Sequence, residues 1–261
     1  MEDKQRVLLK RRLDGARRRA AAWSEPRGPH AGKGTEQCPV PATHDKLDEV
    51  HYFLHRLLLE FHHPVEFRWT LNAYLQASRS VLHMARRELR SHEGFDGWWS
   101  TSNAALNASP LTKRVIDSRN FVVHQGMLSQ TSETMTGIFR GRTFKLGFGG
   151  PVPNDWYSEN LLRFVANVWT GVFLDRAHTS IGEQFGIRRE WRVAELGDGD
   201  VVALCVEAHG LLAGFVVSAH EFGGTAMMPE APEPKGSHDP DRYNVLLETD
   251  LDPTLLTRWG W

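Results

Sequence analysis

The first half of the chain carries apolar residues at the three- and four-residue spacing of amphipathic helices. Thr43 can cap the first of these stretches, and prolines mark the starts of later ones. Gly126 suits the left-handed conformation that often follows a helix end. The pattern therefore predicts four helices with short connections, arranged as an up-and-down bundle, over residues 44–61, 64–90, 95–107 and 110–125.

Beyond residue 126 the pattern changes. Alternating polarity and a glycine predict a β-hairpin at about 133–148. A long fifth helix is predicted over 154–186, with Asn154 or Asp155 as its cap. Three apolar runs after it are predicted as strands, and they contain no motif with a known chemistry: EWRVAEL (190–196), DGDVVALCVEAHG (198–210) and LLAGFVVSAHEF (211–222).

These elements predict a mainly α protein. A four- or five-helix up-and-down bundle would occupy residues 44–185, with the hairpin inserted in it, and a small α+β region would occupy 186–261. The length of 261 residues and the 41% of hydrophobic residues are enough for one large domain or two small ones.

Composition points to a cytoplasmic protein with no disulfide framework. The two cysteines are Cys38, in a loop-like segment, and Cys205, in an apolar run. No stretch approaches the roughly 18 consecutive apolar residues of a membrane-spanning helix, so no membrane partner is expected.

The overall net charge of −1 hides a basic N-terminus. Lysines and arginines cluster within residues 4–19, and residues 24–43 are rich in proline, glycine and polar side chains. Residues 1–43 are therefore interpreted as a basic, flexible tail and linker. The tail can contact phosphates, but it is equally explained as a solvated extension or as translation from a start codon assigned too far upstream.

The stretch SRNFVVHQG, at 118–126, carries the chemistry that stands out. On a helix, Asn120 and His124 lie one turn apart on the same face, and Arg119 lies about 140° round the axis from His124. Two copies related by a two-fold axis would bring all three residue types into one cleft. There, His124 can transfer a proton, Arg119 can stabilise a phosphate and Asn120 can orient the ring.

RNA supplies its own nucleophile, the 2′-hydroxyl group. The predicted activity is therefore a metal-independent endoribonuclease that leaves a 2′,3′-cyclic phosphate and a 5′-hydroxyl. No cofactor and no metal are expected. An alternative is structural: Arg119 would pair with Asp117 or Glu88, and His124 would interact with the carbonyl end of its own helix.

Arg119-Asn120-x3-His124, at the end of the fourth predicted helix, resembles the motif of the HEPN domains (higher eukaryotes and prokaryotes nucleotide-binding). The segments FRWTLNAYLQASRSVL (67–82) and PLTKRVIDSRNFVVHQG (110–126), with the pair Trp98-Trp99, are similar to uncharacterised bacterial HEPN-like proteins. The resemblance covers about residues 45–128. It implies a dimeric ribonuclease of a toxin–antitoxin or phage-defence system, with RNA and an antitoxin as partners, or a non-catalytic dimerisation, nucleotide-binding or protein-binding module.

Two further groups of polar residues each have two interpretations. Asn72, Gln76 and Arg79 form one stripe on the second predicted helix and are either RNA-binding residues lining the same cleft or part of the solvent face. Among the thirteen histidines, His51 and His55 are four residues apart and can bind zinc if His44 or Asp48 joins them. A polar helix face explains these residues more simply, so no metal site is predicted.

Overall fold

The computed structural model describes residues 38–124, 128–169, 174, 182–225 and 240–261. Within helix α5 the backbone is described to its end, but the side chains of residues 119–124 are not. Residues 1–37, most of the predicted tail and linker at 1–43, also lie outside the described residues, as do residues 226–239.

The four helices predicted for the first half of the chain are present. They are α2 (Pro41–Leu59), α3 (Pro64–Leu89), α4 (Phe95–Ala108) and α5 (Pro110–His124). Proline occupies the first turn of α2 and of α3, where its missing N–H removes no helical hydrogen bond. Helix α2 begins three residues before its predicted start because Pro41, rather than Thr43, opens the helix.

A four-stranded antiparallel sheet follows, with the strand order β2-β1-β3-β4. The hairpin expected near 133–148 is formed by β1 (Gln130–Arg140) and β2 (Thr143–Val152), which turn at Gly141 with a φ of 58°. The inner partner of β1 is β3 (Glu183–Val193), and the short β4 (Val245–Leu247) lies beyond it. Helix α6 (Ser158–Trp169) buries Leu162 and Val165 against the sheet residues Ile138, Phe185 and Ile187.

The fold-class prediction of a mainly α bundle was wrong, because the protein is mixed α/β. The largest error concerns residues 198–222, predicted as two strands, which form the single helix α7 (Val201–Phe222). Its side chains are apolar nearly all round, so the sequence shows no helical periodicity to distinguish a buried helix from buried strands. Asp200 caps the helix by accepting a hydrogen bond from the Ala203 N–H at 2.9 Å.

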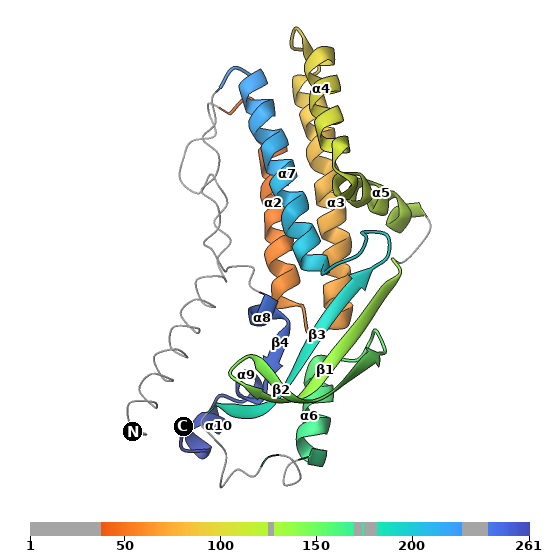
Figure 1. The fold of residues 1–261 in the computed structure, drawn as a ribbon. Coiled ribbons are helices and arrows are strands. Elements are labelled where there is room, and N and C mark those ends of the chain that lie inside the picture. The colour runs from red at the N-terminus through yellow and green to blue at the C-terminus, as the bar shows by residue number, and fades with distance from the viewer. Residues whose placement is uncertain (1–37, 125–127, 170–173, 175–181, 226–239) are drawn as a thin grey trace.

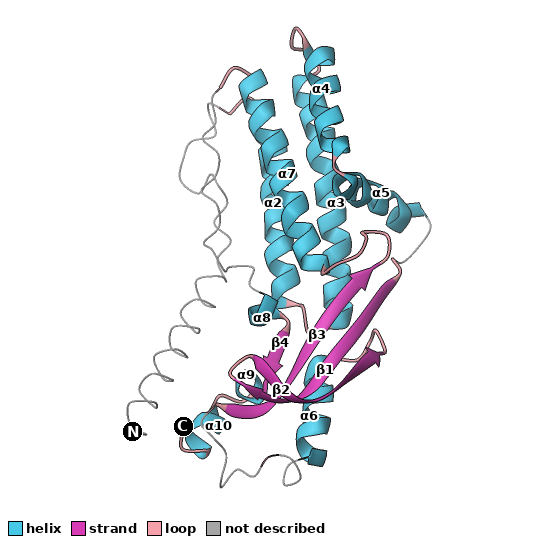
Figure 2. Ribbon diagram, in the orientation of Figure 1, coloured by secondary structure: helices cyan, strands magenta, loops and turns pink. Residues whose placement is uncertain are grey.

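The predicted fifth helix over 154–186 is also shorter than expected. Helix α6 covers Ser158–Trp169, and residues 183–186 belong to β3. Residues 170–173 and 175–181 of the predicted helix lie outside the described residues. In Figure 1, α7 runs alongside α2, α3 and α4, whereas α5 turns away from these long helices. Figure 2 shows the two parts of the fold, with the long helices at one end and the sheet at the other. Three short helices complete the described chain: α8 (Pro240–Tyr243), α9 (Glu248–Leu251) and α10 (Thr254–Arg258).

One core joins α2, α3 and α7, and it continues into the sheet through Trp191 and Val193 of β3. Among the described residues, α7 is the one helix whose length and apolar composition would allow it to cross a membrane. Its buried side chains, including Cys205, Leu212 and Val216, belong to the core.

Candidate functional site

The predicted catalytic residues belong to the last turns of α5. The backbone is helical through His124, so Asn120 and His124 lie one turn apart, as the sequence predicted. The side chains of Arg119, Asn120 and His124 lie outside the described residues. Their joint role at one phosphodiester therefore stays a prediction, as does the dimer that would bring two copies together.

The predicted RNA-binding stripe lies on α3. Gln76 and Arg79 are exposed, and Asn72 is half-buried with its Oδ1 atom away from solvent. The exposed face continues toward the C-terminal end of α3 as a row of basic side chains. We call this set the arginine row: Arg79, Arg86, Arg87 and Arg90.

No member of the arginine row forms an ion pair with any residue in the described part of the chain. The guanidinium group of Arg86 lies 6.0 Å from the centre of the Trp99 ring, and His83 is exposed on the same helix. These four guanidinium groups, three on α3 and one directly after it, have no ion-pair partner among the described residues. They give a strong local positive potential, although the whole chain is nearly neutral.

Glu88, which was considered as a partner for Arg119, has another role. Its carboxylate accepts hydrogen bonds from the N–H groups of Ala42 and Thr43, at 2.8 and 2.9 Å, and from the Thr43 hydroxyl at 2.6 Å. These donors belong to the first turn of α2, so Glu88 caps α2 from the end of the antiparallel helix α3. The alternative pairing of Glu88 with Arg119 stays a prediction, because the Arg119 side chain lies outside the described residues.

Cys38, His44 and His220 come together where α2 begins and α7 ends. One ligand atom from each residue lies within 4.8 Å of the other two, and the Cys38 Sγ and His220 Nε2 atoms are 3.5 Å apart. The two imidazole rings are nearly perpendicular, with centres 4.5 Å apart. His44 and His220 are 2% and 4% exposed, and burial raises the pKa of the half-buried Cys38 thiol.

A second group of histidines lies further along the interface between α2 and α7. The Nε2 atoms of His51 and His55 are 2.6 Å apart, and the His209 ring stands edge-on to His51 with its centre 5.2 Å away. His51 and His55 thus face each other on one helix, and His209 of α7 is the third imidazole that the sequence alone did not identify.

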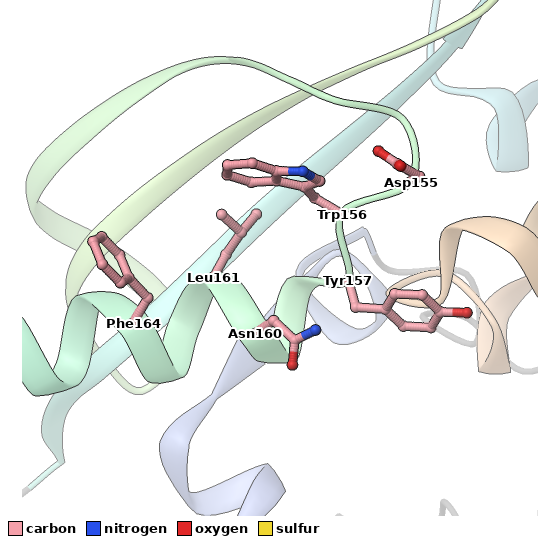
Figure 3. A pocket seen from close by; sticks show the side chains of 6 residues that line it. All are labelled: Asp155, Trp156, Tyr157, Asn160, Leu161 and Phe164. Atoms are coloured by element: carbon pink, nitrogen blue, oxygen red, sulfur yellow. The ribbon is translucent and has the colours of Figure 1, made fainter.

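Aromatic side chains line a hollow of about 370 Å³ formed by the segment before α6 and the first turns of α6. Figure 3 shows Trp156, Leu161 and Phe164 on one side of the segment and Tyr157 turned away from them toward α3. The Tyr157 hydroxyl donates a hydrogen bond to Glu66 at 2.9 Å. The lining has a single charged residue, Asp155, so the hollow is better suited to an apolar side chain than to a phosphate.

Comparison with known proteins adds the family of the chain. The family model described as bacteriophage lambda protein ea47 matches residues 30–244. The chain belongs to this family. A search of curated proteins and a search of solved structures gave no match.

The ea47 match relates the chain to a bacteriophage protein and spans both the α5 motif and the Cys38–His44–His220 cluster. It carries no information on the HEPN resemblance, which stays a prediction. The sequence analysis considered His44 only as a partner of His51 and His55, and it missed this cluster because 182 positions separate Cys38 from His220. A cysteine and a histidine six residues apart, without a nearby partner pair, do not have the spacing of a known zinc motif.

Proposed function

We propose that this protein binds RNA along α3 and cleaves it at the end of α5. The observation that supports binding is the arginine row, in which four exposed guanidinium groups have no acidic partner among the described residues. Arginine forms paired hydrogen bonds to phosphate oxygens, and positive charge on one face is typical of proteins that bind nucleic acids.

The chemistry rests on the residues of α5. His124 removes the proton of the 2′-hydroxyl group, whose oxygen attacks the adjacent phosphorus while the bond to the 5′-oxygen breaks. Arg119 stabilises the negative charge that develops on the phosphate oxygens, and Asn120 orients the imidazole ring. A second His124, in a dimer, is the acid that protonates the leaving 5′-oxygen. The products are a 2′,3′-cyclic phosphate and a 5′-hydroxyl.

The ea47 family is named after a phage protein, and we therefore propose that the ribonuclease activity acts during phage infection of a host. A ribonuclease that acts as a toxin or defence effector, held in check by an antitoxin, is consistent with that setting.

RNA binding is tested by the salt dependence of affinity. Replacing Arg86, Arg87 and Arg90 by glutamine should weaken binding to a single-stranded RNA and lower the slope of log K against log salt by about 2, because each lost phosphate contact removes about 0.7. The matched control is Arg163→Gln on α6, whose guanidinium group already pairs with Glu159 at 2.7 Å. An unchanged slope in the triple variant would contradict the proposed binding surface.

Cleavage is tested with purified protein, a defined RNA and EDTA, below the melting temperature of the EDTA-treated protein. The expected products carry cyclic phosphate ends, and His124→Ala should lower the rate by about 100-fold or more. His92→Ala, at an exposed position after α3, serves as the control. Equal cleavage by the wild type and His124→Ala would exclude the enzyme.

That last outcome would leave the second candidate, a non-catalytic protein-binding module. The observation that favours it is the aromatic hollow at α6, where the side chains of Trp156 and Phe164 are 52% and 66% exposed. Large exposed aromatic side chains around an apolar hollow are typical of protein interaction sites.

A further inference from the structure

We propose that Cys38, His44 and His220 bind a zinc ion. Zn²⁺ binds thiolate and imidazole ligands well, and this cluster offers one thiolate and two imidazoles. Mg²⁺ and Ca²⁺ instead favour oxygen ligands. The site would join three segments of the chain: the residues before α2, the first turn of α2 and the last turn of α7.

The distances are close to those that the ion requires. With Zn–S and Zn–N bonds of about 2.3 and 2.0–2.1 Å, a sulfur and a nitrogen on a tetrahedral ion lie about 3.5 Å apart. Cys38 Sγ and His220 Nε2 are already 3.5 Å apart. All three ligand atoms lie within 4.8 Å of one another, so a shift of about 1 Å in a side chain closes the site.

The surroundings favour a bound cation. The apolar residues Val40, Leu89, Phe95 and Ala219 form a buried cluster against which Cys38 packs. The carboxylate of Glu88 is held by hydrogen bonds to Ala42 and Thr43, in the turn of α2 that also carries His44. A fixed negative charge beside a partly buried site attracts a positive ion.

Three protein ligands leave one position on a tetrahedral ion for water. The consequence for the fold is a link between the start of α2 and the end of α7, which are 182 residues apart at Cys38 and His220. Because the unfolded chain does not hold these ligands together, zinc binding would stabilise the folded state. This role is independent of the RNA chemistry proposed for α5.

The ligands are identified on the full-length protein, stripped with EDTA under a thiol-free reductant and then reloaded. We expect one zinc ion per chain, and X-ray absorption should show one sulfur and two imidazole nitrogens bound to it. With cobalt(II) as the probe, a thiolate charge-transfer band and the strong visible absorption of tetrahedral cobalt should appear. Cys38→Ser should remove the charge-transfer band.

Stability gives a second readout that does not depend on activity. Zinc at about 100 times its dissociation constant should raise the melting temperature by roughly 5 °C or more relative to the EDTA-treated protein. Cys38→Ser and His220→Asn should lose this increase while the stripped variants still melt cooperatively. The matched controls are Cys205→Ala, which removes the other cysteine, and His83→Gln, which removes an exposed histidine.

Three results would overturn the proposal. One is an X-ray absorption spectrum with only nitrogen and oxygen ligands. Another is a zinc-induced increase in melting temperature that persists unchanged in Cys38→Ser and His220→Asn. The third is loss of zinc uptake in a His51→Gln/His55→Gln variant, because that result would place the ion at the second group of histidines.

Discussion

At the scale of single residues, Arg189 is the most unusual group in the fold. Its side chain is fully buried in β3 and makes no ion pair with a described residue. It donates hydrogen bonds to the Trp156 carbonyl and, at 3.0 Å, to the Ser132 hydroxyl, and it lies 4.0 Å from the centre of the Trp191 ring. Burial lowers its pKa to about 10, so Arg189 keeps its charge at neutral pH and fixes the segment before α6 to the sheet.

His62, between α2 and α3, gives a prediction about pH. Burial, with the nearby charges of Arg189 and Arg142, lowers its pKa to about 3. Between about pH 6.5 and pH 3, the unfolded state therefore binds a proton that the folded state does not, and stability falls as the pH falls. The contribution of His62 is about 1.4 kcal/mol per pH unit in this window.

The measurement is urea unfolding of the wild type and His62→Gln between pH 6 and pH 4. The variant should lose stability less steeply than the wild type, whatever its stability at pH 7. The exposed His83→Gln variant is the matched control. Parallel curves for the wild type and His62→Gln would show that the His62 ring takes up its proton in the folded protein.

At the scale of elements, β1 and β2 depend on a pair of facing glycines. Gly137 pairs with Gly147, and a Cβ atom on either one would collide with the backbone of the other strand. The sequence shows glycines in this region but cannot show that two of them face each other, because that depends on the register of the hairpin.

Gly137→Ala should lower the free energy of unfolding by about 2 kcal/mol or more, because the added methyl group forces the strands apart. The matched control is Gly97→Ala in α4, where a Cβ atom has no neighbour within 4 Å. There, alanine should raise stability by up to about 1 kcal/mol, because it is the better helix former. Both changes are measured by chemical unfolding, and a neutral Gly137→Ala variant would contradict the close approach.

The helices show what could be predicted from local sequence. The helices of the first half were located to within a few residues, because prolines and amphipathic spacing are local signals. The same reasoning failed for α7, whose uniformly apolar run fits a buried strand equally well. The motif of α5 was placed correctly on a helix, whereas its partners in space could not be predicted.

At the scale of the whole molecule, Trp191 connects the sheet to the helices. Its indole N–H donates to the Phe61 carbonyl at 2.8 Å, and its ring stacks on Phe67 of α3 with centres 5.2 Å apart. The buried cluster that contains Trp191 also contains residues of α2, α3 and α7. The two parts of the fold therefore share one core.

Trp191→Ala should cost about 3–5 kcal/mol, because it removes a large buried ring and leaves the Phe61 carbonyl without its donor. Hydrogen exchange followed by mass spectrometry should show loss of protection in peptides of both α2 and β1. Trp191→Phe keeps a ring against Phe67 and should cost less. If protection fell only in β1, the sheet and the helices would be separate folding units.

The sequence by itself determined the helices of the first half, the hairpin and the turn of helix that carries Asn120 and His124. Each of these elements is determined by residues close together in the chain, through helix capping, proline positions and the periodicity of apolar side chains. Only the tertiary structure decided that residues 201–222 form a helix inside the bundle and that Cys38 and His44 meet His220. Those outcomes depend on how apolar surfaces of different elements pack together and on contacts between residues far apart in the chain. Such contacts leave no local pattern in the sequence.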